Sequence, residues 1–233
     1  MKCIPFGHEA LLINFEQEIN PKINHEVHEL ASKLKENKAI TFLIPAYCSL
    51  TVGYDRQETS FEKLKKEIEK LSPDKQNHVP NKKLKIPVCY DPEFALDMEE
   101  VSHQTGLSSK EIITAHTACD FTVYMIGFMP GFPYLGKLPD ALHCKRKKVP
   151  RKEVPALAVG LAGFQTGIYP ASSPGGWQII GRTPVSLISG ATHAHFLLQP
   201  GNQVRFYAID ADQFDATKTA FEQGELKIED THD

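Results

Sequence analysis

The chain has 233 residues, of which 24% are charged and 41% are hydrophobic, and its formal net charge is −3. This composition is typical of a globular protein and excludes a disordered or fibrous chain. The near-neutral charge argues against nucleic acid as a partner, because phosphate binding needs a concentrated excess of positive charge. No run reaches the roughly 18 apolar residues of a membrane helix, and residues 1–9 lack the apolar core of a secretory signal. We therefore expect a cytoplasmic protein with no membrane contact.

The first 88 residues show a β-α-β-β-α-β order. The predicted strands cover residues 10–15, 40–44, 50–54 and 84–88, with a weak edge position at Pro87 in the last. A first helix begins at Pro21, since proline is tolerated at the first helical position. A second helix is capped by Ser60 and carries one apolar stripe. This order predicts a ferredoxin-like α+β domain over residues 1–88.

The remaining residues, 89–233, follow another pattern. Two short helices are predicted over 93–104 and 108–117, and Ser108 with Glu111 has the spacing of a capping box. The chain then becomes rich in Gly and Pro, with short β-type runs at 121–126, 156–162, 185–189 and 204–209. Short strands between Gly and Pro turns favour a closed barrel or a sandwich. We expect an α+β protein of two domains, the second mainly β.

Residues 127–136 combine Gly, Pro and aromatic side chains, which predicts a rigid loop with exposed rings. Such a loop is typical of a barrel corner as well as of a ligand site. Gly131, Gly136 and Lys137 match the spacing G-x-x-x-x-G-K of a phosphate-binding loop. However, Leu138 stands where Ser or Thr would hold magnesium, and Pro133 lacks the backbone N–H that a phosphate cradle needs. We conclude that this segment is not a P-loop.

A second Gly-rich stretch covers residues 163–184. Gln165, Thr166 and Tyr169 supply neutral donors and acceptors, and Arg182 supplies a positive fork. These groups suit a small polar ligand that carries an amide or a carboxylate. The stretch has no paired carboxylates and no Ser-His-Asp set, so it resembles a binding and polarising site more than a hydrolytic triad. A glycine-rich hairpin around a core Trp177 is the other interpretation.

Three weaker signals remain open. His116 is a candidate base, acid or phosphate partner, or a structural residue near a helix end. His193 and His195 share the spacing of one strand face, but without a third ligand, and with no C-x-x-C pair in the chain, we expect no metal site. A basic segment is either a solvated loop or an anion-binding element; it contains Lys145, Arg146, Lys147, Lys148, Arg151 and Lys152.

Several motifs in order resemble the family of 5-oxoprolinase B subunits, which is also described as the Kip inhibitor or allophanate hydrolase subunit 1 family. They read G-F-x-P-G-F-P-Y-L-G at 127–136, P-R-x-x-V-P-A at 150–156, Q-T-G-I-Y-P at 165–170, S-P-G-G-W-Q-x-I-G-R-T-P at 173–184 and V-R-F at 204–206. Together with the N-terminal segment, the resemblance covers nearly the whole chain.

The resemblance implies an α+β domain joined to a cyclophilin-like β-barrel, and a component of an ATP-dependent enzyme that opens 5-oxoproline to glutamate. ATP, with Mg, would phosphorylate the lactam oxygen so that water can attack the carbonyl carbon. The nucleotide would be bound either by this chain or only by the complex. The implied partners are a homologous C subunit and an A subunit of 5-oxoprolinase, and a small cyclic amide. The alternative within the family is an inhibitor of a sensor histidine kinase that binds through the barrel.

Site residues are carried over from the motifs of the resembled family. The catalytic candidates are His116, Gln165, Thr166 and Tyr169, and the binding candidates are Tyr134, Trp177 and Arg182, with Pro130, Gly131 and Phe132 as a wall. The implied roles are an anion partner for Arg182, lactam contacts for Gln165 and Thr166, and proton or phosphate handling for His116. Departures from the family pattern at Leu157, Ala158 and Phe164 leave an allophanate-type or urea-type amide as the other substrate class.

Overall fold

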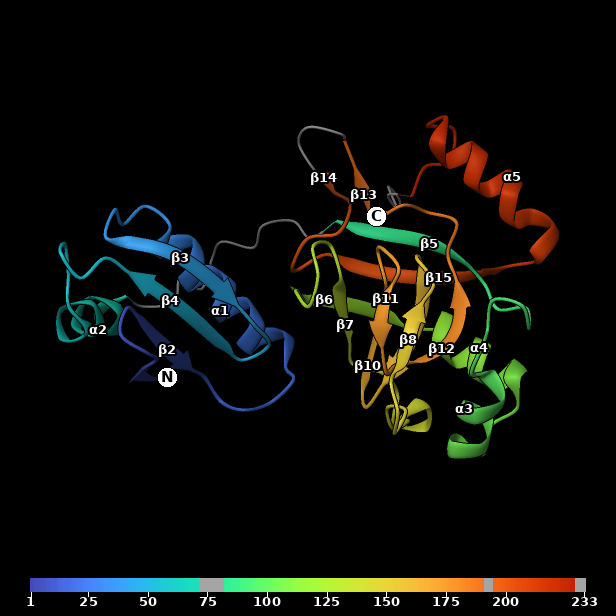
Figure 1. Ribbon diagram of the computed structural model, residues 1–233, viewed down its shortest axis with the longest axis horizontal. Coiled ribbons are helices and arrows are strands. Elements are labelled where there is room, and N and C mark those ends of the chain that lie inside the picture. The colour runs from blue at the N-terminus through green and yellow to red at the C-terminus, as the bar shows by residue number, and fades with distance from the viewer. Residues whose placement is uncertain (72–81, 191–194, 229–233) are drawn as a thin grey trace. The chain divides into compact units, whose positions relative to one another are not determined.

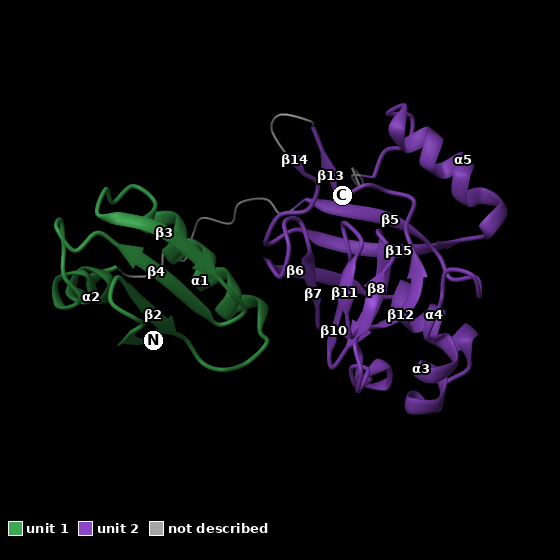
Figure 2. Cartoon of the chain, viewed as in Figure 1, with its two compact units in different colours: residues 1–80 green, residues 81–233 purple. Residues whose placement is uncertain are grey.

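The structure is a computed structural model, and it describes residues 1–71, 82–190 and 195–228 (Figure 1). The chain divides into two compact units, Met1–Pro80 and Asn81–Asp233, which Figure 2 shows in different colours. The expected α+β class is confirmed, with a small mixed unit first and a closed β-barrel second. None of the helices in the described residues combines the length and apolar character needed to cross a membrane.

The first unit is a four-stranded antiparallel sheet with two helices. Its elements are β1 (Lys2–Pro5), β2 (Ala10–Asn14), α1 (Pro21–Leu34), β3 (Ile40–Pro45), β4 (Ser49–Tyr54) and α2 (Phe61–Lys70). The strand order across the sheet is β1-β2-β4-β3. Both helices begin where the sequence predicts, because the Asn20 and Ser60 side chains accept hydrogen bonds from backbone N–H groups of the first turn.

Both helices bury their apolar stripes against one face of this sheet. Val27 and Leu30 of α1 and Leu64 of α2 share a core with alternate strand residues, such as Leu11 and Leu50. Because strand side chains alternate between faces, the residues between these positions point to the opposite face. The first unit is therefore a two-layer arrangement with a core on one side of its sheet.

One strand assignment differs from the sequence prediction. Residues 84–88 were expected to complete the first sheet, but β5 (Lys83–Cys89) is a strand of the barrel and pairs in parallel with β15 (Gln203–Ile209). The edge position that it would have filled is taken by β1, which pairs with β2. The first unit thus keeps the antiparallel ferredoxin-like order, with an edge strand from the N-terminus. Residues 83–88, placed in the first domain by sequence, belong to the second unit.

The second unit is built on a seven-stranded barrel in the order β10-β7-β6-β15-β5-β12-β9. Its other strands are β6 (Asp120–Ile126), β7 (Pro133–Gly136), β9 (Ala158–Ala162), β10 (Gln165–Ile168) and β12 (Gln178–Arg182). Two small two-stranded sheets accompany it, β8 (Arg151–Val154) with β11 (Ser173–Gly175), and β13 (Ile188–Ser189) with β14 (His195–Phe196). Its helical elements are α3 (Met98–Thr105), α4 (Ser109–Thr117), a 3-10 turn (Asp140–Leu142) and α5 (Ala211–Glu222).

The two helices between β5 and β6 complete the core of the barrel. Met98 and Val101 of α3 and Ile112 of α4 join the inward residues of the strands in one apolar cluster. The predicted capping box of α4 is confirmed, since the side chains of Ser108 and Glu111 both bond to backbone N–H groups. Helix α3 begins at Met98 rather than at 93, and α5, which buries none of its residues, was not predicted. Only Ile188–Ser189 of the strand expected at 185–189 forms.

Candidate functional site

The predicted site residues do not form one cluster, because two of them lie inside the barrel. His116 and Thr166 are both completely buried, and His116 Nε2 lies 3.0 Å from Thr166 Oγ1. Tyr90 OH lies 2.7 Å from His116 Nδ1, and Thr166 Oγ1 donates to the carbonyl of Gly160. The His116 ring also stacks on Phe206, at 4.7 Å between ring centroids.

These contacts define the tautomer of His116. The only hydrogen of the Thr166 hydroxyl is used on Gly160, so this oxygen must accept from His116 Nε2–H. His116 Nδ1 is then free of hydrogen and accepts from the Tyr90 hydroxyl. Burial lowers the pKa of His116 to about 3, so the ring is neutral at physiological pH. This geometry describes a saturated structural chain and argues against proton or phosphate handling by His116.

Strand alternation separates Gln165 from Thr166. Thr166 pairs with Leu135 and Leu161 and points into the barrel with them, whereas Gln165 points to the outer face. Gln165 is half-buried and pairs with Gly136 on β7. The sequence motifs predicted that both side chains contact one lactam. Because they lie on opposite faces of β10, they cannot do so.

The outer face of β7, β10 and β9 carries an aromatic cluster, formed by Phe132, Tyr134, Tyr169 and Trp177. The Phe132 ring is central, at 4.9 to 5.4 Å from the other three ring centroids and edge-on to each of them. Edge-to-face contacts of this kind are a favoured aromatic geometry. The structure thus brings four of the predicted binding and catalytic residues together, and three of them are buried.

Glycine makes this cluster fit against the barrel. A Cβ atom at Gly167 would lie 3.1 Å from both the Phe132 and Trp177 rings, and 2.7 Å from the carbonyl of Pro133. A Cβ atom at Gly175 would lie within 3 Å of the Tyr169 ring and hydroxyl. The glycines of the stretch 163–184 therefore allow close approach between the backbone and these rings.

The loop before β7 presents one exposed ring beside this cluster. Phe128 is 63% exposed, although it is large and apolar, and its φ of 66° lies in the left-handed region. Non-glycine residues in this region carry backbone strain, which is common at ligand-binding positions. Of the predicted wall, Phe132 lies in the cluster, Gly131 packs against Ile188, and Pro130 is exposed.

Arg146 was expected only as part of a basic segment, but it contacts the aromatic cluster. Its guanidinium lies 5.8 Å from the centroid of the Trp177 ring, within the range of a cation–π contact. Burial raises the pKa of both Tyr134 and Tyr169, and the positive charge of Arg146 opposes this effect at each hydroxyl. The aromatic cluster therefore has a cationic edge that no sequence motif indicated.

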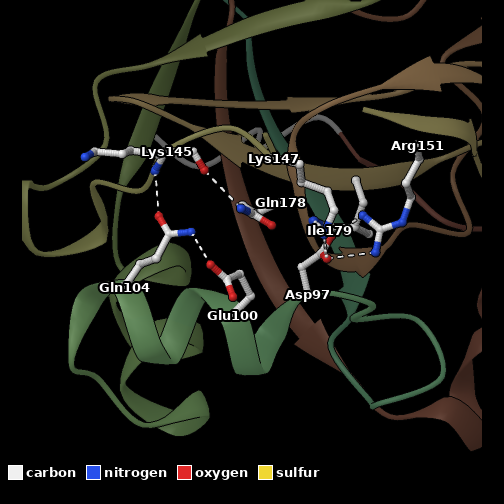
Figure 3. A network of polar contacts seen from close by, with 8 residues as sticks. All are labelled: Asp97, Glu100, Gln104, Lys145, Lys147, Arg151, Gln178 and Ile179. Carbon is white, nitrogen blue, oxygen red and sulfur yellow. Dashed lines mark hydrogen bonds and ion pairs between the residues drawn. The ribbon is translucent and has the colours of Figure 1, made fainter. Parts of the chain in front are cut away.

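Two further cations of the basic segment are neutralised by a buried carboxylate (Figure 3). Asp97 is 4% exposed and accepts from Lys147 at 2.8 Å, from both terminal nitrogens of Arg151 at 2.6 and 2.7 Å, and from Ile179 N–H at 2.7 Å. Burial alone would raise the pKa of Asp97, but the hydrogen bonds from Arg151 and Lys147 outweigh it and lower this pKa below its ordinary value. Lys147 and Arg151 therefore serve the fold, and sequence spacing did not reveal their acidic partner.

Arg182, at the end of β12, borders a small pocket on the same outer side of the barrel. The pocket is lined by Glu93, Phe94, Leu96, Pro155, Ala158, Ile179 and Arg182. Arg182 Nε donates to the carbonyl of Ala156 at 2.9 Å, which fixes the direction of the side chain. Among the described residues no acceptor bonds to its terminal nitrogens. The pocket thus combines a cationic fork with apolar walls and one carboxyl group, and sequence reasoning missed Glu93 and Leu96.

The described residues contain neither a phosphate cradle nor a cluster of three metal-ligating side chains. The segment that matches G-x-x-x-x-G-K contains β7, an extended strand paired on both sides, so it forms no phosphate cradle. Over residues 1–71, 82–190 and 195–228, no three His, Cys, Asp or Glu residues are grouped to hold a metal ion. His193 lies outside the described residues. The described part of the chain therefore shows neither a P-loop nor a group of three metal-ligating side chains.

Comparison with known proteins shows the family to which this chain belongs. Residues 1–198 match the family described as carboxyltransferase domain, subdomain C and D. The chain is 40% identical to the 5-oxoprolinase B subunit of Bacillus subtilis, over 91% of this chain and 94% of that protein. It is 35% identical to the protein of the same name from Escherichia coli O157:H7, over 88% and 94% of the two chains.

A solved structure shows the same fold in a longer chain. The crystal structure of TTHA0988 is 34% identical and superposes with a TM-score of 0.76 over 87% of this chain. This chain corresponds to only 40% of TTHA0988. The homologues over most of the chain are thus B subunits of 5-oxoprolinase, and the fold also occurs as part of a larger polypeptide.

Proposed function

Because the chain belongs to the family of carboxyltransferase subdomains C and D and its homologues are B subunits of 5-oxoprolinase, we propose that it is one component of an ATP-dependent 5-oxoprolinase. Ring opening breaks the amide C–N bond of 5-oxoproline, adds the oxygen of water to the carbonyl carbon and leaves the nitrogen as the amine of glutamate. An amide is a poor electrophile, and ATP supplies the activation for this step. The proposed reaction therefore needs a substrate site and a nucleotide site.

The Arg182 pocket carries the substrate part of this proposal. A carboxylate accepts two parallel hydrogen bonds from a guanidinium fork, and the terminal nitrogens of Arg182 have no protein acceptor among the described residues. Leu96 and Pro155 would contact the ring methylenes, and Glu93 would accept from the lactam N–H. A pocket with apolar walls and a few polar groups is typical of small-ligand sites.

The aromatic cluster, Phe132, Tyr134, Tyr169 and Trp177, supports the strands that form this pocket. Ala158 and Ile179 belong both to the apolar core around these rings and to the pocket lining. A rigid cluster directly beside a binding pocket keeps its walls in place, as an effective site requires. We assign the cluster to support, and we assign the exposed Phe128 and Arg146 beside it to contact with the rest of the enzyme.

The nucleotide is assigned to the companion subunits. Within the described residues, the β7 segment forms no phosphate cradle, and no three His, Cys, Asp or Glu residues are grouped to hold a metal ion. The homologues are named as one lettered component of an enzyme, which implies further components. We therefore place ATP in the assembly, together with a companion homologous to this chain and a third polypeptide.

The test is an assay of the chain with its companion subunits, in which ADP release is followed with and without 5-oxoproline. We expect ADP release that depends on 5-oxoproline in the mixture and none from this chain alone. The compound 2-pyrrolidinone, which has the lactam but no carboxylate, serves as a matched control and should be a far poorer substrate. If no combination with the companions from the same genome releases ADP in response to 5-oxoproline, the proposal is wrong.

A further inference from the structure

Within the described residues of the first unit, one face of the sheet is apolar and neither α1 nor α2 packs on it. Both α1 and α2 lie on the opposite face of the sheet (Figure 1). Side chains at alternate strand positions therefore point away from the core. In a two-layer α/β arrangement this second face is normally polar, because it is exposed to water. Here Phe6, Phe42 and Ile44 on this face are 55%, 45% and 54% exposed.

Register places these side chains in two rows, one across four strands and one across three strands and Phe6, which directly follows β1. The first row runs Ile4–Leu12–Thr51–Ile44 through consecutive cross-strand pairs. The second row runs Phe6–Ala10–Gly53–Phe42, with Phe6 joined to Ala10 by a backbone hydrogen bond. We call these eight residues the open face.

The open face has a defined shape and border. Four strands at about 4.8 Å spacing make it about 14 Å wide, and its rows lie about 7 Å apart along the strands. The Phe42 ring lies directly over Gly53, where a Cβ atom would overlap it, so the ring lies flat on the sheet. The next row, Lys2–Asn14–Ser49, is polar and ends the apolar area on one side. A contiguous apolar area with a polar border is typical of a protein–protein interface.

We propose that the open face binds one of the two companions of the multi-subunit enzyme, the polypeptide homologous to this chain, through an apolar surface of that companion. This rests on the proposed function, in which the chain does not act alone. Two comparisons support this occupant: homologues of this length are named as one subunit of several, and in TTHA0988 the corresponding part is joined to a longer remainder of the same chain. In TTHA0988 the peptide chain itself joins the two parts. A separate polypeptide has no such link, so it needs a non-covalent interface to stay bound to its companion.

The test compares substitutions on the open face. The chain is mixed with its companion subunits, and the dissociation constant is measured by isothermal titration calorimetry, with size-exclusion chromatography and light scattering for mass. Ile44→Asp and Phe42→Asp should each weaken association at least tenfold. Ser49→Asp, on the same face but in its polar row, and Val149→Asp, 79% exposed in the second unit, should change it less than twofold. Far-UV circular dichroism and thermal unfolding confirm that each variant is folded.

Three results would overturn the proposal. They are unchanged association of folded Ile44→Asp and Phe42→Asp, no binding of the wild-type chain to any companion, and a dimer of this chain alone that Ile44→Asp dissociates. The last result would mean that a second copy covers the open face. Because association is measured without turnover, a complex that Ile44→Asp disrupts but that does not hydrolyse ATP supports the interface and contradicts only the proposed reaction.

Discussion

Three arginines from the Gly-rich half of the chain show how surroundings decide the role of one residue type. Arg151 is held by the buried Asp97, and Arg146 lies over Trp177. Arg182 has one backbone acceptor and a pocket beside its remaining nitrogens. Of these three cations, only Arg182 combines a fixed direction with unused donors, which is what recognition of a small carboxylate requires.

Replacement of Arg182 should affect 5-oxoproline binding before catalysis. A charge-assisted hydrogen bond contributes about 1.5–3 kcal/mol, so Arg182→Ala should raise the KM for 5-oxoproline about 10- to 100-fold. Arg182→Lys keeps the positive charge but loses the guanidinium fork, so its KM for 5-oxoproline should lie between those of the wild type and Arg182→Ala. Steady-state kinetics of the assembled enzyme measures both, with the exposed Arg56→Ala as control. Residual turnover of 2-pyrrolidinone, which lacks the carboxylate, should be equal in wild type and Arg182→Ala; an equal rise in KM for both compounds would contradict the assignment.

His116 should make the stability of the protein dependent on pH. Its folded pKa of about 3 lies below the ordinary value of 6.5, so the unfolded chain binds more protons between these pH values. Above pH 6.5 the neutral His116 ring makes its full contribution to the free energy of unfolding. As the pH falls below 6.5, this contribution decreases by about 1.4 kcal/mol per pH unit. Between pH 7 and pH 5 the wild type should therefore lose about 2 kcal/mol more than His116→Gln. Urea unfolding at both pH values measures this, and equal losses would show that His116 is not a buried neutral base.

At the level of elements, β9, β10 and β12 each serve two cores. Their inward side chains, such as Leu161 and Ile168, fill the barrel, while their outward residues, such as Ala162 and Ile179, pack against the aromatic cluster. Small outward residues are necessary, because the rings lie directly on the strands. Helix α3 is joined to this layer from the other side, since Asp97 at its N-terminus bonds to Ile179 on β12 and to Arg151 on β8.

Asp97→Asn should loosen α3 from the barrel. Removal of one partner from a buried ion pair costs about 3–5 kcal/mol, and the lower end applies here because Lys147 and Arg151 remain partly exposed. The matched control is Asp120→Asn, which breaks an exposed bidentate pair with Arg205 and should cost about 1 kcal/mol or less. Chemical denaturation of the two variants compares these values. A similar loss of stability in both variants would mean that the buried Asp97 network contributes no more to stability than the exposed Asp120 pair.

On the scale of the whole molecule, the two units have separate cores. The core of the first unit and the two clusters of the second share no residue among those described. The proposed functions are divided in the same way, with substrate recognition in the second unit and the companion interface on the open face of the first. Such a division allows one unit to be altered without loss of the other.

Separate cores predict separate responses to core truncation. Leu50→Ala in the first unit and Leu161→Ala in the second should each lower the stability of their own unit by about 2–5 kcal/mol. Differential scanning calorimetry should resolve two transitions in the wild type, with each substitution lowering one of them. A single transition that both substitutions lower equally would show that the units unfold together.

Local structure and family membership follow from the order of residues. Helix starts at Asn20, Ser60 and Ser108 result from side-chain capping, which acts within three residues and leaves a fixed spacing. Apolar periodicity predicted the buried faces of α1 and α2, and the Gly-rich motifs indicated the relatives among 5-oxoprolinase B subunits. These features depend on neighbours in the chain, so the amino-acid sequence contains them directly.

Which segments meet depends instead on the tertiary fold. Apolar periodicity records that residues 84–88 are buried but not that their partner is β15, whose register begins 120 residues later at Gln203. It could not place Gln165 outside and Thr166 inside the barrel, because both faces of β10 are covered. Asp97 and Arg151 are 54 residues apart, and an ion pair at that separation leaves no regular spacing. The spacing of apolar residues along the chain predicts which residues are buried. Which distant segment they contact depends on how the whole chain packs.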